Sequence, residues 1–205
     1  MRRTGGVARI AVLAATLATA TACGAGGRDD AGAGGGAAAA GDGGAFRPLA
    51  IGEAVPAYAA VLVGAGAADS VRIAGEGAPA TAADGGALTL VNVWATWCTS
   101  CREEFADLER LHRDYAPRGV RVVAVSVDES SDERVARFAR REGVTFTIAH
   151  DPEGRVQRLY QAVGVPETYL VSPDGRLLWR HGGALRNGAP EARQAIEQAL
   201  ASSAR

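Results

Sequence analysis

The stretch that decides the fold of this chain reads LTLVNVWATWCTSC and occupies positions 88–101. Its first half is a short, β-rich apolar run of the kind that forms a buried strand. Beyond it, apolar residues recur at helical spacing between charged ones: Phe105, Leu108, Leu111 and Tyr115. The pattern therefore predicts that Cys98 and Cys101 lie where a buried strand passes into an amphipathic helix.

The position of the two cysteines indicates a redox-active dithiol. We expect Cys98 in the first turn of the helix, where unpaired backbone N–H groups and the positive end of the helix dipole lower the pKa of a thiol below its free value of about 8.5. Cys98 is then the nucleophile. Cys101 lies one turn further along the same helix face, where it is more shielded and can resolve a mixed disulfide by attacking the Cys98 sulfur.

Three other interpretations of the cysteine pair are less favourable. A purely structural disulfide would close a very short loop, worth only about 2 kcal/mol in the chain-entropy model. A zinc site needs about four ligands, but there is no second cysteine pair, and His112, His150 and His181 are scattered. A c-type haem attachment requires His directly after the second cysteine, and Arg102 stands there. We therefore expect neither a metal ion nor another cofactor.

Two motifs together resemble a known family. The segment VNVWATWCTSCREE at 91–104 and the segment GVPETYLV at 164–171, followed by DGR at 174–176, are similar to bacterial membrane-tethered thioredoxin-like thiol:disulfide oxidoreductases. Those proteins serve cytochrome c maturation and related extracytoplasmic reductions. The resemblance covers roughly residues 46–205. It implies an α/β, thioredoxin-like fold, in which helices flank a central mixed sheet.

The resemblance also implies how a substrate would be recognised. Pro166 corresponds to the family's cis-proline, which faces the cysteine pair. The backbone of Val165 would pair with an extended substrate chain, so that recognition uses main-chain hydrogen bonds and tolerates varied side chains. Trp97 would shape the surroundings of the exposed sulfur. In the alternative interpretation, Pro166 simply ends a helix before the next strand.

The chain departs from the family pattern around the second cysteine. Many members have proline between the cysteines, whereas this chain has Thr and Ser at 99–100, so no relative's redox potential can be transferred to it. Asn92 replaces the buried aspartate of thioredoxin and cannot titrate. Glu104 matches a family glutamate and could accept or relay the proton of Cys101. Alternatively, Glu104 is a solvated helix charge that pairs with Arg102 or with an arginine nearby.

The amino terminus predicts export. Arginines at positions 2, 3 and 9 precede an apolar run at 10–18 that leads into ATACG at 20–24. This order is typical of an export signal over residues 1–22, and the run is shorter than the roughly 20 residues of a stable membrane span. Its end resembles a bacterial lipobox with Cys23 as the lipidated residue, which leaves no stray thiol. An uncleaved signal anchor is the alternative, and both keep the remaining chain outside the membrane and tethered to it.

The rest of the chain divides into a tether and one domain. Residues 23–45 are rich in Gly and Ala and predict a flexible tether, and residues 46–205 suffice for one compact domain. We expect an amino-terminal hairpin of strands 58–63 and 70–73. A capping box of Ser130 and Glu133 would start a helix that Gly143 ends. The other expected elements are strands at 120–127, 145–149, 167–171 and 176–180, a helix at 155–162 and a last helix from about Pro190.

The net charge and the family resemblance together lead to an expected function. The formal charge is −1 and the pI about 6.3, so nucleic acid is not an expected partner. By resemblance we expect an extracytoplasmic enzyme that is anchored to the bacterial cell membrane and reduces disulfides of exported proteins such as apocytochrome c. A membrane-embedded electron donor would then reduce the enzyme's own disulfide again. The alternatives are a disulfide oxidant or isomerase, a peroxiredoxin-like peroxidase, whose Pro-x-x-x-Thr-x-x-Cys setting is absent, and a non-enzymatic tethered adaptor.

Overall fold

The computed structural model describes residues 47–64, 69–73 and 88–203. The expected signal peptide at 1–22, the lipidation site Cys23 and the tether at 23–45 lie outside these residues and stay predictions. No helix in the described part of the chain is both long and apolar enough to cross a bilayer.

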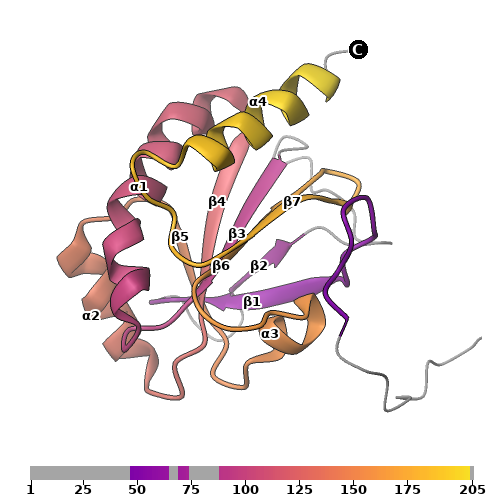
Figure 1. The fold of residues 1–205 in the computed structure, drawn as a ribbon. Coiled ribbons are helices and arrows are strands. Elements are labelled where there is room, and N and C mark those ends of the chain that lie inside the picture. The colour runs from indigo at the N-terminus through magenta and orange to yellow at the C-terminus, as the bar shows by residue number, and fades with distance from the viewer. Residues whose placement is uncertain (1–46, 65–68, 74–87, 204–205) are drawn as a thin grey trace, which may run out of the picture. The chain divides into compact units, whose positions relative to one another are not determined.

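A mixed sheet of seven strands forms the centre of the domain, in the order β2-β1-β5-β4-β3-β6-β7 (Figure 1). The strands are β1 (Tyr58–Leu62), β2 (Ser70–Ile73), β3 (Leu88–Trp94), β4 (Val120–Ser126), β5 (Thr147–His150), β6 (Glu167–Val171) and β7 (Leu177–Gly182). β3, β4 and β5 are parallel, and the remaining pairs are antiparallel. The predicted α/β class with a central mixed sheet is confirmed.

The predicted amino-terminal hairpin is also confirmed. β1 and β2 pair in antiparallel fashion from Tyr58 opposite Ile73 to Val61 opposite Ser70. β1 also pairs with the end of β5, through Val61 opposite His150. The hairpin therefore extends the main sheet on the side of β5, away from β3 and the cysteines.

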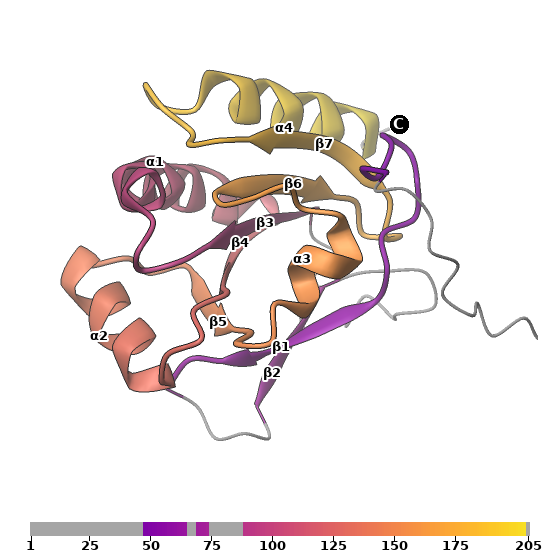
Figure 2. The same cartoon turned by 60° about the horizontal axis from the view of Figure 1, so that its bottom comes forward.

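The helices cover both faces of the sheet. They are α1 (Thr99–Tyr115), the short 3-10 helix η2 (Ala116–Arg118), α2 (Asp132–Glu142), α3 (Arg155–Tyr160) and α4 (Pro190–Ser203). α1 and α2 lie on one face and α3 on the other (Figure 2). This follows from topology, because β3, β4 and β5 are successive parallel neighbours, and right-handed crossovers place both connecting helices on the same face. An ion pair between Arg193 and Asp114, at 2.6 Å, joins α4 to α1.

An aromatic cluster lies at the end of β3, next to the connection that leads to the cysteine pair. β3 is buried along its whole length, as expected for a parallel strand covered on both faces. Trp94, its last residue, packs against Phe105 of α1 and Phe138 of α2, with ring centroids 4.6 and 5.1 Å away. Trp94 is thus a core residue, and its packing fixes the point at which the chain leaves β3 for the cysteines.

Two local predictions need correction. The capping box of Ser130 and Glu133 is wrong, because α2 begins one residue later, with Ser131 as the N-cap and no side-chain capping bond. Acidic residues in its first turn complement the helix dipole instead. β5 begins at Thr147 and not at Thr145, because Glu109 of α1 accepts both the N–H and the hydroxyl of Thr145, at 2.7 and 2.8 Å.

Gly143 ends α2 in the left-handed conformation, with φ at +67°. Its N–H donates to the carbonyls of Ala139 and Arg140 at 3.1 and 3.2 Å. A methyl group added here would meet nothing within 4 Å, so the cost of Gly143→Ala is backbone strain alone. We expect a loss of about 1 kcal/mol in the free energy of unfolding, measured by urea denaturation. Gly182→Ala, equally unobstructed but without a positive φ, should change little, and an equal loss at both positions would contradict this account.

Candidate active site

Cys98 and Cys101 form a disulfide at the start of α1. Cys98 is the N-cap residue, with φ −82° and ψ 110°, and the helix begins at Thr99. The prediction that Cys98 lies inside the first turn is therefore wrong by one residue, because its backbone is still extended. Cys101 lies within the first turn and is fully buried, whereas Cys98 is 6% exposed. A reaction partner can therefore reach the pair only at Cys98.

The N-cap position suits a thiolate. The backbone N–H of Cys101 donates to Sγ of Cys98 at 3.1 Å, and the hydroxyl oxygen of Ser100 lies 3.4 Å from the same sulfur. The first turn of α1 contains no acidic residue. An N–H donor and the positive end of a helix dipole both stabilise negative charge on sulfur once the disulfide is reduced.

The segment before β6 approaches the disulfide from the other side. The Val165–Pro166 peptide bond is cis, and the carbonyl oxygen of Val165 lies 3.7 Å from Sγ of Cys98. The pairing of β6 with β3 explains this approach, because Glu167 stands opposite Val93 near the end of β3. The fold thus brings together Cys98 and Pro166, which the sequence singled out separately.

Two large apolar side chains close in sequence to these residues are exposed to solvent. Trp97, directly before Cys98, is 68% exposed, and Val163, two residues before Val165, is 74% exposed. Single exposed apolar residues are common on protein surfaces, but these two lie within two positions of Cys98 and Val165 along the chain. Both side chains are therefore exposed next, in sequence, to residues that meet at the disulfide.

Glu104 is fully buried within α1. Its Oε1 accepts from the Asn92 side-chain amide and its Oε2 from the Leu185 backbone N–H, both at 2.8 Å. Burial raises the pKa of Glu104 from 4.5 to about 7, although both hydrogen bonds act to lower it. The alternative of a solvated charge that pairs with Arg102 is therefore wrong.

Asn92 contributes a donor to this buried cluster and carries an acceptor that is not used. Its Nδ2 donates to Glu104 and to the Thr168 hydroxyl at 2.8 and 3.0 Å. Its Oδ1 is buried and has no hydrogen-bond partner among the described residues. A rotation of the amide would present Oδ1 to Glu104, so Asn92 can serve both protonation states of the carboxyl group.

Glu167, directly after Pro166, belongs to the site and was missed by sequence reasoning. It is 2% exposed and forms an ion pair with Arg180 of β7. Its Oε2 accepts from the Val163 N–H at 2.9 Å. This hydrogen bond holds in place the segment that contains Val165. The sequence contained a signal for this ion pair, because a hairpin around the turn at 173–175 places Glu167 and Arg180 diagonally across the two strands.

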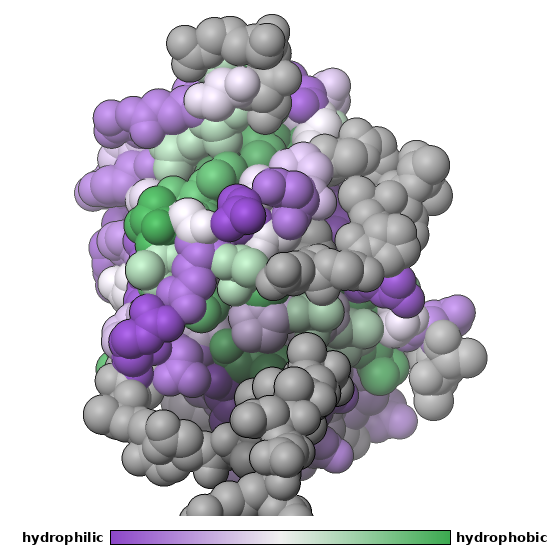
Figure 3. All heavy atoms as spheres, turned by 90° about the vertical axis from the view of Figure 1, so that its right-hand side faces the viewer, coloured by the Kyte–Doolittle hydropathy of each residue, from purple (hydrophilic) through white to green (hydrophobic). Residues whose placement is uncertain are grey.

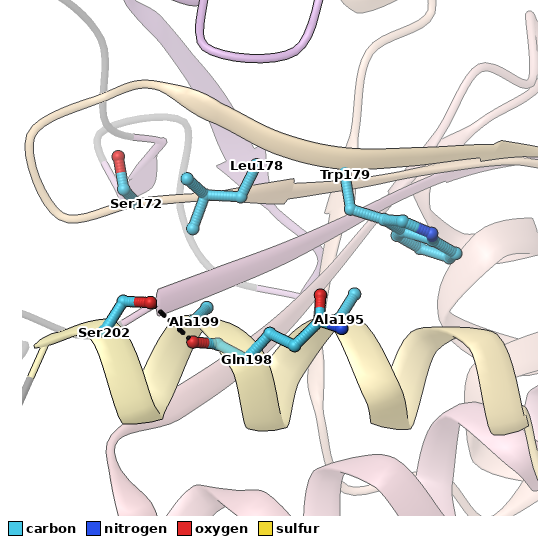
Figure 4. Close-up of a pocket in the computed structure, with 7 residues that line it drawn as sticks. All are labelled: Ser172, Leu178, Trp179, Ala195, Gln198, Ala199 and Ser202. Carbon is cyan, nitrogen blue, oxygen red and sulfur yellow. Dashed lines mark hydrogen bonds between the residues drawn. The ribbon is translucent and has the colours of Figure 1, made fainter.

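A separate pocket of about 350 Å³ lies between β7 and α4. Figure 4 shows Leu178 and Trp179 above the helix in this pocket. The surface in Figure 3 shows patches of hydrophobic residues among hydrophilic ones, on the side of the molecule that includes the end of α4. The pocket is also lined by Ser172, Ala195, Gln198, Ala199 and Ser202. Ser172 lies beside the start of β3, because Val171 is opposite Thr89, whereas Cys98 follows the end of β3. The pocket is therefore not part of the cysteine site.

A cysteine pair at a helix N-terminus, opposite a cis-proline segment and at the end of a central strand of a mixed sheet, is the arrangement of a thioredoxin-like dithiol protein. The AhpC/TSA family model matches residues 63–180, more than half of the chain. The chain belongs to the AhpC/TSA family.

Individual relatives agree with this assignment. Thiol-disulfide oxidoreductase ResA from Oceanobacillus iheyensis is 36% identical over 88 residues, which cover 43% of this chain and 45% of the relative. ResA from Geobacillus thermodenitrificans is 34% identical over 119 residues, 58% of this chain and 68% of the relative. A Chlorobium tepidum structure, assigned as a thiol:disulfide interchange protein DsbE, superposes with a TM-score of 0.63 at 27% identity and covers 74% of this chain and 99% of that one.

The chain is thus a homologue of thiol-disulfide oxidoreductases with a Cys-x-x-Cys pair, and its fold is thioredoxin-like. It spans about half the length of several curated relatives that it matches.

Proposed function

We propose that the protein is an extracytoplasmic thiol:disulfide oxidoreductase that reduces disulfides of exported proteins, with apocytochrome c as the favoured substrate. The observation that carries the proposal is the N-cap position of Cys98, whose sulfur accepts the Cys101 N–H at 3.1 Å. This geometry gives the more exposed sulfur a hydrogen-bond donor that favours its thiolate, next to a fully buried second sulfur. The ResA and DsbE relatives are named for this chemistry.

The reaction proceeds in two exchange steps. The Cys98 thiolate attacks a substrate disulfide, which forms a mixed disulfide and releases one substrate thiolate. Cys101 loses its proton and attacks Sγ of Cys98, which releases the second substrate thiolate and forms the Cys98–Cys101 disulfide. Two electrons pass from the enzyme to the substrate, and a membrane-embedded electron donor restores the dithiol. Glu104, one turn beyond Cys101, receives the Cys101 proton directly or through a relay.

Substrate binding relies on the surface around Cys98. The backbone of Val165, next to the cis Pro166, offers main-chain groups to an extended substrate segment, as in strand addition. Trp97 and Val163 provide apolar contacts on the exposed rim. Recognition through the backbone fits an enzyme that acts on unfolded exported proteins of varied sequence.

We propose that the predicted amino-terminal signal directs this activity to the outside of the cytoplasmic membrane. Lipidation of Cys23 would anchor the protein, and residues 23–45 would give the domain reach toward its partners. An uncleaved signal anchor would lead to the same location.

The reduction potential tests the direction of electron flow. We would equilibrate the full chain, carrying Cys23→Ser so that only one thiol pair remains, in glutathione buffers. For a reductant we expect a potential near or below about −230 mV. A potential near about −120 mV would mean that the protein is an oxidant and would overturn the reductase proposal, while the cysteine roles would remain.

A further inference from the structure

A buried carboxylate lies beneath the connection between β3 and α1. Asp128 follows the end of β4 and is 2% exposed. Its Oδ2 accepts the backbone N–H of Thr96 at 2.8 Å, and its Oδ1 accepts the Thr96 hydroxyl at 2.5 Å. The parallel pairing of β3 and β4, with Trp94 opposite Ser126, brings the two residues together. Thr96 is therefore bound through both its backbone and its side chain, two residues before Cys98.

Asp128 is itself held in place. The Ser126 hydroxyl donates to Oδ2 of Asp128 at 2.6 Å. The backbone N–H of Asp128 donates in turn to the same hydroxyl oxygen, at 3.2 Å. A ring nitrogen of His150, at the end of β5, lies 2.8 Å from the Asp128 carbonyl oxygen. A buried carboxylate with three donors is a rigid anchor, because breaking any of these bonds leaves a polar group unsatisfied in the interior.

This anchor fixes the residues that set the position of Cys98. Residues 95–97 are the whole connection between β3 and the N-cap. The Val127 N–H donates to the Trp94 carbonyl at 2.9 Å, and the Cys98 N–H donates to the Ala95 carbonyl at 3.2 Å. Asp128 supplies the side-chain contact in the middle of this connection, at Thr96.

We propose that Asp128 is a positioning residue of the redox centre: through Thr96 it holds Cys98 at the N-cap of α1, where the Cys98 sulfur receives the Cys101 N–H, and it thereby sets the reduction potential of the pair. This role deepens the proposed oxidoreductase function and rests on it.

Loss of the hydrogen bonds of Asp128 and loss of its negative charge would shift the reduction potential of the cysteine pair in opposite directions. Without the anchor, Thr96 loses its acceptor and Cys98 is no longer held against the Cys101 N–H. The thiolate is then less stable, and the disulfide is harder to reduce. Removal of a nearby negative charge alone would instead favour the thiolate and make the disulfide easier to reduce. The sign of the change therefore separates positioning from simple electrostatics.

The test measures the glutathione equilibrium of the full chain with Cys23→Ser, together with the pKa of Cys98 in the reduced protein. For Asp128→Ala we expect the equilibrium constant for reduction by glutathione to fall about tenfold, a potential about 30 mV more negative, and the pKa of Cys98 to rise. Thr96→Val keeps the backbone bond, so its effect should be smaller and of the same sign. The double variant should match Asp128→Ala alone, because the hydroxyl bond that Thr96→Val removes is already absent once Asp128 is gone.

Two further variants make the result decisive. Asp128→Asn can still accept the Thr96 N–H and should return the constant to the wild-type value or above it. Asp151→Ala is the matched control: Asp151 is a buried carboxylate at the end of β5 that accepts the Val156 N–H of α3 at 2.7 Å. It should lower stability without moving the potential.

Three results would overturn the proposal: an unchanged potential in Asp128→Ala, a potential that rises in it, or additive effects of the two single variants. If Asp128→Ala does not fold, Thr96→Val decides by the sign of its shift. A wild-type protein that failed to reduce protein disulfides would refute the proposed function, while the glutathione equilibrium would still show whether Asp128 positions Cys98.

Discussion

Cys98→Ser is expected to abolish disulfide reduction, with a loss in kcat/KM of roughly 10³-fold or more. A serine hydroxyl cannot form the mixed disulfide and is not ionised near neutral pH. The reduction of insulin with dithiothreitol as electron donor, followed by turbidity, measures the loss. Because the Cys98–Cys101 bridge closes a very short loop, its removal should cost little stability, and the lost activity will not reflect unfolding.

Cys101→Ser is the matched variant, because it removes the other sulfur of the same disulfide. The proposed nucleophile Cys98 remains, so we expect this variant to attack a substrate disulfide and then stop at the mixed disulfide. Mass spectrometry without reductant should reveal the trapped adduct. An adduct in Cys98→Ser but not in Cys101→Ser would reverse the two roles. Full biological function in both variants would instead support the non-enzymatic adaptor.

The junction of β3 and α1 could be predicted from the sequence because its signals are local. A continuous apolar run, a cysteine pair and helical periodicity all fall within residues 88–115. The hairpin at β1 and β2 and the turn at Gly143 were likewise predicted from short segments. Neighbouring residues determine strand and helix formation at these places, and the structure differs from the prediction mainly at element ends.

The partners of the buried carboxylates could not be predicted. Glu104 binds the Leu185 N–H, 81 positions away, and Asp128 binds Thr96, 32 positions away. Hydrophobic periodicity predicts which face of a helix or strand is buried, but it does not specify which distant polar groups meet there. The burial of Glu104 itself could have been inferred, because Cys101, Glu104, Phe105 and Leu108 share one helix face.

Glu104→Gln is expected to change how stability depends on pH. In the folded, oxidised protein the pKa of Glu104 is about 7, against 4.5 as its ordinary value. Between these pH values the folded protein retains a proton that the unfolded chain releases. The free energy of unfolding therefore falls as pH rises through this window, by about 3 kcal/mol, and levels off above about pH 7. The amide that replaces the carboxyl group stays neutral, so the variant should not show this fall.

Urea denaturation of the oxidised protein at pH 5 and pH 8 measures the difference. The matched control is Glu103→Gln, which removes an exposed carboxylate from the same turn, paired with Arg186 at 2.9 Å. It leaves the buried cluster of Asn92, Glu104 and Leu185 untouched and should retain the wild-type pH dependence. A wild-type profile in Glu104→Gln would mean that Glu104 is ionised throughout this range.

The same variant tests the proton transfer, because a neutral amide cannot accept the Cys101 proton. Resolution of the mixed disulfide should slow by about 10²-fold, the lower range for loss of a general base, while attack by Cys98 continues at its normal rate. Stopped-flow measurement of the two steps should show that the wild-type resolution rate increases through about pH 7, and that this increase is absent in Glu104→Gln. If resolution keeps its rate while the pH dependence of stability disappears, Glu104 is a buried acid without a part in catalysis. If the resolution rate and the pH dependence of stability change together, one cause explains both results. The burial that destabilises the folded protein when Glu104 is ionised also gives Glu104 a pKa suited to exchanging protons near neutral pH.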